Sequence, residues 1–273
     1  MFYQKIPVSI DGNGKAALLE LYLLDTPEDK IKIKKRPMII ICPGGSYEKV
    51  SYREGEPLAV HFLSQGYHAC ILRYSVAPVT FPAQFLELAR TVKMLREHAE
   101  EWKIDAEHII VQGSSAGGHL AAGYGVFWRQ EWIRERVHAL PEELRPGGIM
   151  LSYPVITTDA EYTHMRSVEN LLGDKKEEYA VQMSLEKQSL ADMPPCFLWH
   201  TCEDEAVPVE NSLLFASALV KAAVPVELHI FPKGGHGLSL ASKLVEREDG
   251  SGVQEECAGW IHLADKWLSG LCK

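Results

Sequence analysis

Short apolar runs alternate along the chain with longer stretches in which apolar residues recur at helical spacing. This alternation is typical of an α/β domain, and we expect one such domain over residues 1–273. The pattern predicts strands at Leu18–Leu24, Pro37–Cys42, Tyr67–Arg73, His108–Gln112, Gly148–Ser152, Cys196–His200 and Val226–Phe231. It predicts helices at Pro57–Gln65, Pro82–Trp102, His119–Phe127, Val209–Ala223 and Gly252–Leu268.

Two segments depart from the alternation. Lys30–Arg36 carries five basic residues in seven, which we interpret as a solvated strand or loop rather than a nucleic-acid site, since the protein as a whole is acidic. Pro154–Pro195 shows no clear strand over about 40 residues. Because excursions of that length tend to be functional lids or substrate-binding elements, we expect a small cap-like element there that contributes to specificity.

Composition and charge exclude several function classes. The 273 residues include 28 Lys plus Arg against 37 Asp plus Glu, a formal net charge of −9. This balance argues against nucleic acid or an anionic membrane surface as a partner. No run approaches the roughly 18 apolar residues of a membrane span, and the first residues lack the pattern of a signal peptide.

Cysteine usage points to a reducing compartment. The six cysteines are scattered, with no CxxC pair and no Cys/His spacing for a metal. We therefore expect buried, reduced thiols and a cytoplasmic protein.

The motif with the clearest chemistry is Gly113-x-Ser115-x-Gly117, between the strand ending at Gln112 and a helix rich in Ala and Gly. A serine on such a sharp strand-to-helix turn is lifted above the edge of the sheet, and the flanking glycines leave room for the strained backbone. This context predicts that Ser115 is a nucleophile, whereas a plain glycine-rich turn is the alternative.

A serine nucleophile requires a base, and His236 is the best placed of the 11 histidines. It lies in Lys233-Gly234-Gly235-His236-Gly237, directly after the last predicted strand. The imidazole in turn needs an anion to hold its tautomer. Three neighbouring acids follow the strand ending at His200, and their composition does not choose among them: Glu203, Asp204 and Glu205.

An oxyanion hole requires backbone amides directed at the developing negative charge. The segment Pro43-Gly44-Gly45-Ser46-Tyr47 follows a predicted buried strand, so its small residues can present free N–H groups beside Ser115. Ala116, directly after the nucleophile, supplies another amide at a helix N-terminus. The order Ser, acid, His at successive strand ends makes a joint coincidence improbable.

These motifs together resemble the α/β-hydrolases of the esterase/lipase superfamily. The chain is most similar to small bacterial carbohydrate-esterase-like members, often described as acetyl xylan esterases or acetyl-esterase-like proteins. The resemblance runs from about Arg36 to Phe231 and on to His236, and rests on the segments CPGGSY, ILRYSVAP with FPAQ, GSSAGGHLA, PPCFLWHTCEDEAVPVENS and FPKGGHG. It implies a mostly parallel sheet with helices on both faces.

The resemblance also assigns roles to residues. The family pattern D-x-x-V-P places the acid at Asp204, with Ser115 as nucleophile and His236 as base. The amides of Gly45, Ser46 and Ala116 become the oxyanion donors. Ser46 stands where related lipases have a third glycine, and an acid role for Glu203 stays open.

Three further residues lie close to these motifs in the sequence. We interpret His119 as structural, because it lies at the start of a helix. Tyr47 and Arg73 are candidates for the border of the pocket.

The expected activity is hydrolysis of short acyl esters, with acetyl esters of sugars or xylo-oligosaccharides as the suggested substrates, through an acyl-enzyme intermediate. The alternatives are an amide or formamide hydrolase on the same triad, peptidase or arylformamidase-like, and a non-catalytic binding protein with the same fold. No motif for a metal, nucleotide or flavin is present, so we expect a small-molecule ester as partner and no cofactor. A homodimer is left open.

Overall fold

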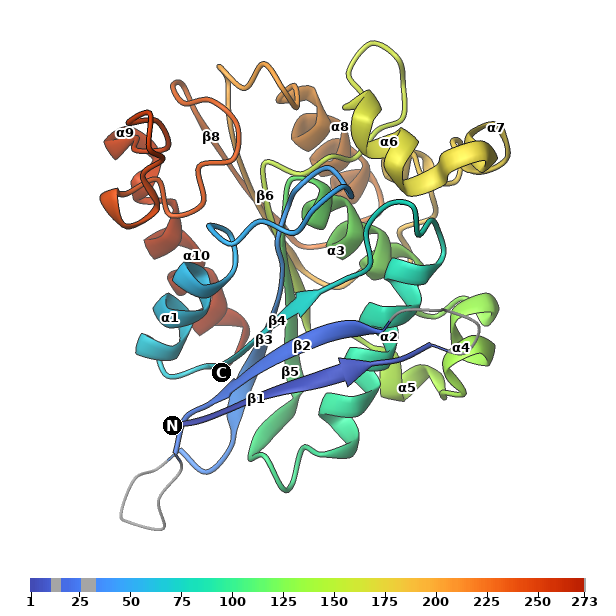
Figure 1. Ribbon diagram of the computed structural model, residues 1–273, viewed down its shortest axis with the longest axis vertical. Coiled ribbons are helices and arrows are strands. Elements are labelled where there is room, and N and C mark those ends of the chain that lie inside the picture. Colours follow the sequence, from blue (N-terminus) through green and yellow to red (C-terminus); the bar gives the residue numbers. More distant parts are fainter. Residues whose placement is uncertain (11–15, 26–32, 273) are drawn as a thin grey trace.

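A mixed sheet forms the centre of the computed structural model, which describes residues 1–10, 16–25 and 33–272 (Figure 1). Its strand order is β1-β2-β4-β3-β5-β6-β7-β8. The strands from β3 to β8 run parallel, whereas β2 is antiparallel to both of its neighbours. The strands are β1 (Phe2–Val8), β2 (Ala17–Leu23), β3 (Arg36–Cys42), β4 (His68–Arg73), β5 (Ile104–Ser114), β6 (Gly148–Ser152), β7 (Cys196–Thr201) and β8 (Val226–Phe231).

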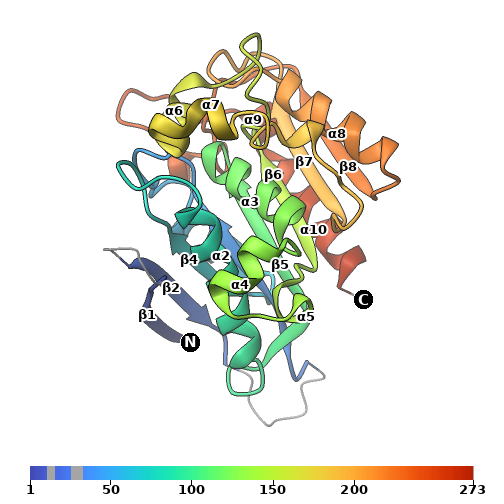
Figure 2. The same ribbon diagram turned by 90° about the vertical axis from the view of Figure 1, so that its right-hand side faces the viewer.

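Helices cover both faces of this sheet. Helices α1 and α10 pack on one face, and α2, α3 and α8 pack on the other (Figures 1 and 2). The helices are α1 (Glu56–Ser64), α2 (Ala83–Glu97), α3 (Ala116–Phe127), α4 (Glu131–Val137), α5 (Pro141–Leu144), α6 (Met165–Leu172), α7 (Lys176–Tyr179), α8 (Glu210–Lys221), α9 (Glu255–Ala258) and α10 (Trp260–Leu271). The fold class predicted from the sequence is thereby confirmed.

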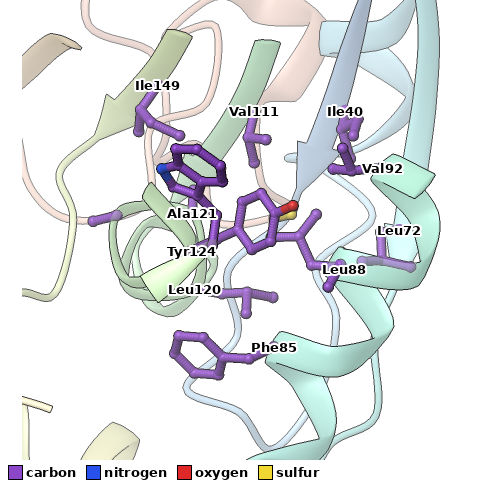
Figure 3. Packing of buried hydrophobic residues seen from close by; sticks show 14 of the residues in the cluster. Ile40, Leu72, Phe85, Leu88, Val92, Val111, Leu120, Ala121, Tyr124 and Ile149 are labelled. Carbon is purple, nitrogen blue, oxygen red and sulfur yellow. The ribbon is translucent and has the colours of Figure 1, made fainter. Parts of the chain in front are cut away.

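The continuous apolar run of β3 is explained by its central position. Met38 and Ile40 contribute to the core on the side of α2 and α3, and Ile39 and Ile41 contribute to the core on the side of α1 and α10. Successive side chains of a strand point to opposite faces, so a strand covered on both sides is apolar throughout. Figure 3 shows the first of these cores, in which side chains of the strands meet residues of α2 and α3.

The element boundaries differ from the prediction at three places. Helix α2 ends at Glu97 rather than Trp102, because the Trp102 ring stacks on His98 in the turn that leads to β5. Helix α10 begins at Trp260 rather than Gly252, whose φ of +92° is a left-handed conformation that a helix does not take. Strand β1 is not predicted, since it is a largely exposed edge strand with little apolar periodicity.

The excursion 154–195 contains α6, α7 and two short 3-10 turns, and it has no strand, as its sequence predicts. In both views α6 and α7 lie at the end of the molecule toward which the parallel strands run (Figures 1 and 2). This end carries the loops after β3, β5, β7 and β8. The excursion is therefore placed at the edge of the sheet where the motif residues gather.

The remaining predictions concern the basic run and the cysteines. Residues 30–32 of the basic run lie outside the described residues, but Lys35 pairs with Glu100 and Arg36 donates to the Gly66 carbonyl. All six cysteines are free, four of them buried, whereas Cys202 is exposed in the turn after β7 and corrects the expectation of burial. In the part of the chain that the structure describes, no helix has both the length and the apolar character needed to cross a bilayer.

A buried acid on α2 makes stability depend on pH. The Glu87 carboxylate accepts hydrogen bonds from the backbone and hydroxyl of Ser75, and burial raises its pKa from 4.5 to about 7 despite these bonds. Between those pH values the folded protein binds a proton that the unfolded chain has released. The free energy of unfolding therefore falls as pH rises from about 4.5 to about 7.

We expect Glu87→Gln to remove this pH dependence, which is on the order of 3 kcal/mol at about 1.4 kcal/mol per pKa unit. Urea unfolding of both proteins at pH 5 and pH 8 measures it. The wild type should lose more stability than the variant between the two pH values. An equal loss in both proteins would contradict the account, because all other titrating groups are shared.

Candidate active site

Ser115 lies in a tight turn between β5 and α3. Its backbone has φ 54° and ψ −120°, a left-handed conformation that is strained for a serine. A Cβ at Gly113 would lie 2.1 Å from the Gly117 carbonyl oxygen, and a Cβ at Gly117 would lie 2.0 Å from that of Cys42. The turn therefore needs glycine at both flanking positions, and it presents the Ser115 hydroxyl at the end of the sheet.

The structure brings Ser115, His236 and Asp204 together as a hydrogen-bonded chain. Ser115 Oγ is 2.7 Å from His236 Nε2, and His236 Nδ1 is 2.6 Å from Asp204 Oδ2. His236 comes from the loop after β8, and Asp204 comes from the turn after β7. This arrangement allows the imidazole to accept the serine proton while the carboxylate holds its tautomer.

The Asp204 carboxylate is buried and well supplied with donors. Its Oδ1 accepts from the backbone amides of Ala206 at 3.1 Å and Val207 at 2.9 Å, and its Oδ2 lies 3.3 Å from His200 Nε2. Burial alone would raise the pKa of Asp204, but the bonds from His200 and His236 outweigh it and hold the pKa well below its usual range. The group is thus an anion at neutral pH, as an imidazole partner requires.

The two neighbouring acids occupy different positions. Glu203 is exposed, and its carboxylate accepts from the Gly234 amide at 3.1 Å, in the loop that carries His236. Glu205 is exposed as well. Among the residues that the structure describes, only Asp204 of the three acids is hydrogen-bonded to the His236 ring. Glu203 therefore ties the loop in place without touching the imidazole.

Three predicted oxyanion donors surround Ser115. Gly45 and Ser46 line the same hollow as Ser115 and His236, and Ala116 is the first residue of α3. The backbone of Gly45 has φ +130° and that of Ser46 has φ +58°. Within the described ranges, the amides of these three residues donate no hydrogen bond to the protein. They are free to receive a negative oxygen.

A buried carboxylate links the loop after β3 to the loop of His236. Glu54 accepts from the Gly44 amide at 2.9 Å and from the Tyr153 hydroxyl at 2.7 Å. That hydroxyl accepts from the Ser239 amide at 2.8 Å, and the Tyr153 ring meets the His236 ring edge-on at 5.1 Å. The single side chain of Glu54 thereby fixes the relative position of the two loops.

No sequence pattern singles out Glu54, because its partner Tyr153 lies 99 positions away along the chain. A weak signal existed for Tyr153. It is a polar aromatic residue directly after the carboxyl end of β6, at the edge where functional groups of a parallel sheet gather.

The other sequence candidates lie away from the hollow. His119 is buried and bridges the Tyr47 hydroxyl at 3.1 Å and the Met183 carbonyl at 3.0 Å, and burial lowers its pKa to about 4. Tyr47 lines a separate small cavity together with His119 instead of the hollow. Arg73 pairs with Glu20 at 3.0 Å on the neighbouring strand. Neither Tyr47 nor Arg73 borders the hollow.

The excursion 154–195 is bonded to the loop after β3, which carries the predicted oxyanion donors Gly45 and Ser46. Asn170 of α6 donates to the Ser46 carbonyl at 2.8 Å, and Arg166 pairs with Glu48. His164, at the start of α6, has a pKa lowered first by burial and then by the positive charge of His236. Helix α6 is therefore bonded to the loop that carries Ser46, although none of its residues lines the hollow at Ser115.

Among residues 1–10, 16–25 and 33–272, no three His, Cys, Asp or Glu side chains are grouped so that they could hold a metal ion.

The chain is similar to proteins of known name. Residues 24–219 match the family described as BD-FAE. Over 213 residues the chain is 39% identical to endo-1,4-beta-xylanase B of Butyrivibrio fibrisolvens, covering 76% of this chain and 33% of that protein. Over 247 residues it is 26% identical to the acetylxylan esterase of Xylanibacter ruminicola, covering 88% and 47%. The chain thus spans between a third and half of the length of these curated relatives.

Two solved structures match over nearly their whole length. The acetyl ester-xyloside bifunctional hydrolase from Caldicellulosiruptor lactoaceticus is 36% identical with a TM-score of 0.84, covering 98% of this chain and 96% of that one. The carboxylesterase Cest-2923 from Lactobacillus plantarum WCFS1 is 28% identical with a TM-score of 0.87, covering 99% and 98%.

Because Asp204 contacts the His236 ring and Glu203 does not, their neutral variants should differ in how fast Ser115 reacts. Asp204→Asn should slow covalent labelling of Ser115 by a fluorophosphonate at least about 100-fold, since loss of the anion beside a catalytic imidazole costs roughly 10⁴-fold in kcat. Glu203→Gln keeps an acceptor for the Gly234 amide and should leave the labelling rate nearly unchanged. The rates are measured from gel fluorescence over time. A slower reaction for Glu203→Gln than for Asp204→Asn would reverse the assignment of the acid.

Proposed function

The chain belongs to the BD-FAE family, and from this premise we propose that it is a serine carboxylic-ester hydrolase. The α/β-hydrolase fold that the sequence resemblance implies is confirmed by the solved structures. The observation that carries the proposal is the hydrogen-bonded chain from Ser115 through His236 to Asp204 beside three free backbone amides. This geometry fits acyl transfer to a serine and onward to water.

In the proposed reaction, Ser115 Oγ attacks the ester carbonyl carbon while its proton passes to His236 Nε2. The amides of Gly45, Ser46 and Ala116 stabilise the oxyanion of the tetrahedral intermediate. The bond from carbon to the alcohol oxygen then breaks, and that oxygen takes the proton from His236. Water attacks the acyl-enzyme with His236 as base, and the proton returns to Ser115 Oγ as the carboxylic acid leaves.

The substrate class that we propose is a short-chain acyl ester, in particular an acetyl ester of a sugar or xylo-oligosaccharide. Similar proteins named acetylxylan esterase and acetyl ester-xyloside bifunctional hydrolase support it. The hollow at Ser115 has a volume of about 280 Å³, which suits a small ester group rather than a long acyl chain. The cytoplasmic location stays a prediction from the sequence, and the homodimer stays open.

Removing the nucleophile tests the proposal. Ser115→Ala should abolish release of acetate from acetylated xylo-oligosaccharides and from p-nitrophenyl acetate, since no other group attacks the carbonyl. Ser269→Ala, on an exposed part of α10, serves as the matched control and should keep full activity. Acetate is quantified enzymatically.

Full activity of Ser115→Ala would overturn the nucleophile. Release from p-nitrophenyl acetate alone would leave a serine esterase with another natural substrate. Cleavage of p-nitroacetanilide in preference to the ester would favour the amide hydrolase instead.

Removing the carboxylate that holds the loop after β3 should lower kcat without a matching rise in KM. Glu54→Ala leaves the Gly44 amide without its acceptor, and a single oxyanion donor is worth about 10²–10³-fold in kcat, so we expect a loss of at least about tenfold. Tyr153→Phe keeps the bond between Glu54 and Gly44 and should lose less. Steady-state kinetics on both variants measure the loss of kcat, and thermal unfolding shows whether the variants are still folded. An unchanged kcat in folded Glu54→Ala would show that the loop holds its position without this carboxylate.

A further inference from the structure

The hollow beside Ser115 has an excess of positive charge. Its lining includes three cationic side chains, Lys49, Arg53 and Arg247, but only one carboxylate, that of Glu54. Lys49 is exposed at the rim, and the two arginines are half-buried. Any group bound next to Ser115 therefore meets a wall with more cations than anions.

The carboxylate of Glu54 does not neutralise this wall by a direct pair. It is buried and is already bonded to the Gly44 amide and the Tyr153 hydroxyl. Asp249, the other acid whose charge reaches the two arginines, accepts from the Ser251 amide at 2.9 Å and is exposed. Glu48, near the loop, pairs with Arg166 of α6. In the described part of the chain, no carboxylate lies within 4.0 Å of the charged nitrogens of the three cations.

Neutral carbonyl groups hold the two guanidinium groups in place. Arg53 donates to the Gly237 carbonyl at 2.9 Å and to the Val245 carbonyl at 2.7 Å. Arg247 donates to the carbonyls of His236 and Gly237, each at 3.2 Å, and to the Ser251 hydroxyl at 3.1 Å. Of the five N–H donors of a guanidinium, three are thus used in Arg247, and two are left for a ligand.

The two arginines also repel each other. The pKa of Arg53 is lowered first by burial and then by the positive charge of Arg247. Like charges held together in a half-buried place raise the free energy of the unliganded site, and an anion that enters relieves it. A carboxylate oxygen forms a strong, charge-assisted hydrogen bond with a guanidinium N–H group that has no other acceptor, as is the case for the remaining donors of Arg247.

We propose that the hollow binds a carboxylate carried by the ester substrate, on its acyl or its alcohol portion, next to the reacting bond. The site is formed by Arg247 and Lys49, with Arg53 behind them. This inference rests on the proposed ester hydrolysis and adds a substrate class to it, namely esters that carry a negative charge.

Two matched substrate pairs test it. For the acyl side, 4-nitrophenyl hemisuccinate is compared with 4-nitrophenyl valerate, and for the alcohol side, 4-acetoxybenzoate is compared with 4-acetoxybenzamide. The quantity of interest is the ratio of kcat/KM for the anionic ester to that for the neutral one, divided by the same ratio for alkaline hydrolysis. We expect this quotient to be at least about tenfold in one pair and to fall as ionic strength rises.

Charge variants locate the effect. Lys49→Gln and Arg247→Gln should each lower the quotient about threefold to tenfold, whereas Lys49→Arg and Arg247→Lys should keep most of it. Lys221→Gln, an exposed change at the end of α8, is the control and should leave it unchanged. Because Arg247 also holds the His236 loop, its substitution can slow both substrates of a pair, and the quotient cancels that common loss.

The outcomes separate this inference from the function on which it rests. Hydrolysis of neutral esters with a quotient near one in both pairs overturns the carboxylate site and leaves the esterase intact. If no ester is hydrolysed, the proposed function fails, and the carboxylate site is tested by a binding measurement instead. The Ser115→Ala protein is then titrated calorimetrically with 4-acetoxybenzoate and with monomethyl succinate, and so is the same protein with Arg247→Gln added. We expect Arg247→Gln to weaken the binding. Equal affinity in these two proteins overturns the proposal.

Discussion

The close approach of two backbone segments is the constraint on which the rest of the site depends. The first turn of α3 lies so near the end of β3 that Gly117 has no room for a Cβ beside the Cys42 carbonyl. This contact joins the carboxyl ends of β3 and β5, which are neighbours in the sheet. The turn that carries Ser115 and the loop after β3 are therefore in direct contact. The strained backbone at Ser115 is held in place by a sheet that is buried on both faces.

Around that contact, buried polar groups connect segments that are distant in sequence. Glu54, Tyr153 and Asp204 are each almost inaccessible to solvent, and each forms at least one hydrogen bond with a residue of another loop. A buried polar group is costly when unpaired and rigidifying when satisfied, so these contacts fix the loops together. Such fixed dipoles and donors are what a charge that appears only in a transition state requires.

Local signals were sufficient for every strand except β1, for the turn of Ser115 and for the loop of His236, but not for the contacts that hold these segments together. Ser115 and His236 stand in segments whose glycines mark tight turns, and that pattern is visible in the sequence alone. Composition could not show which of the three acids after β7 meets His236. The direction of each side chain depends on the backbone turn, in which the Val207 amide donates to the Asp204 carboxylate. Glu54 was invisible for a similar reason, since its partner Tyr153 is 99 positions away.

The exposed thiol of Cys202 makes this protein unusually convenient to label. Four of the six cysteines are buried, and burial raises the pKa of Cys272 to about 12, which keeps its reactive thiolate scarce. A maleimide dye would thus attach at Cys202 without any engineered cysteine. The dye would be located two residues from Asp204, where its fluorescence would report on the acid turn during turnover.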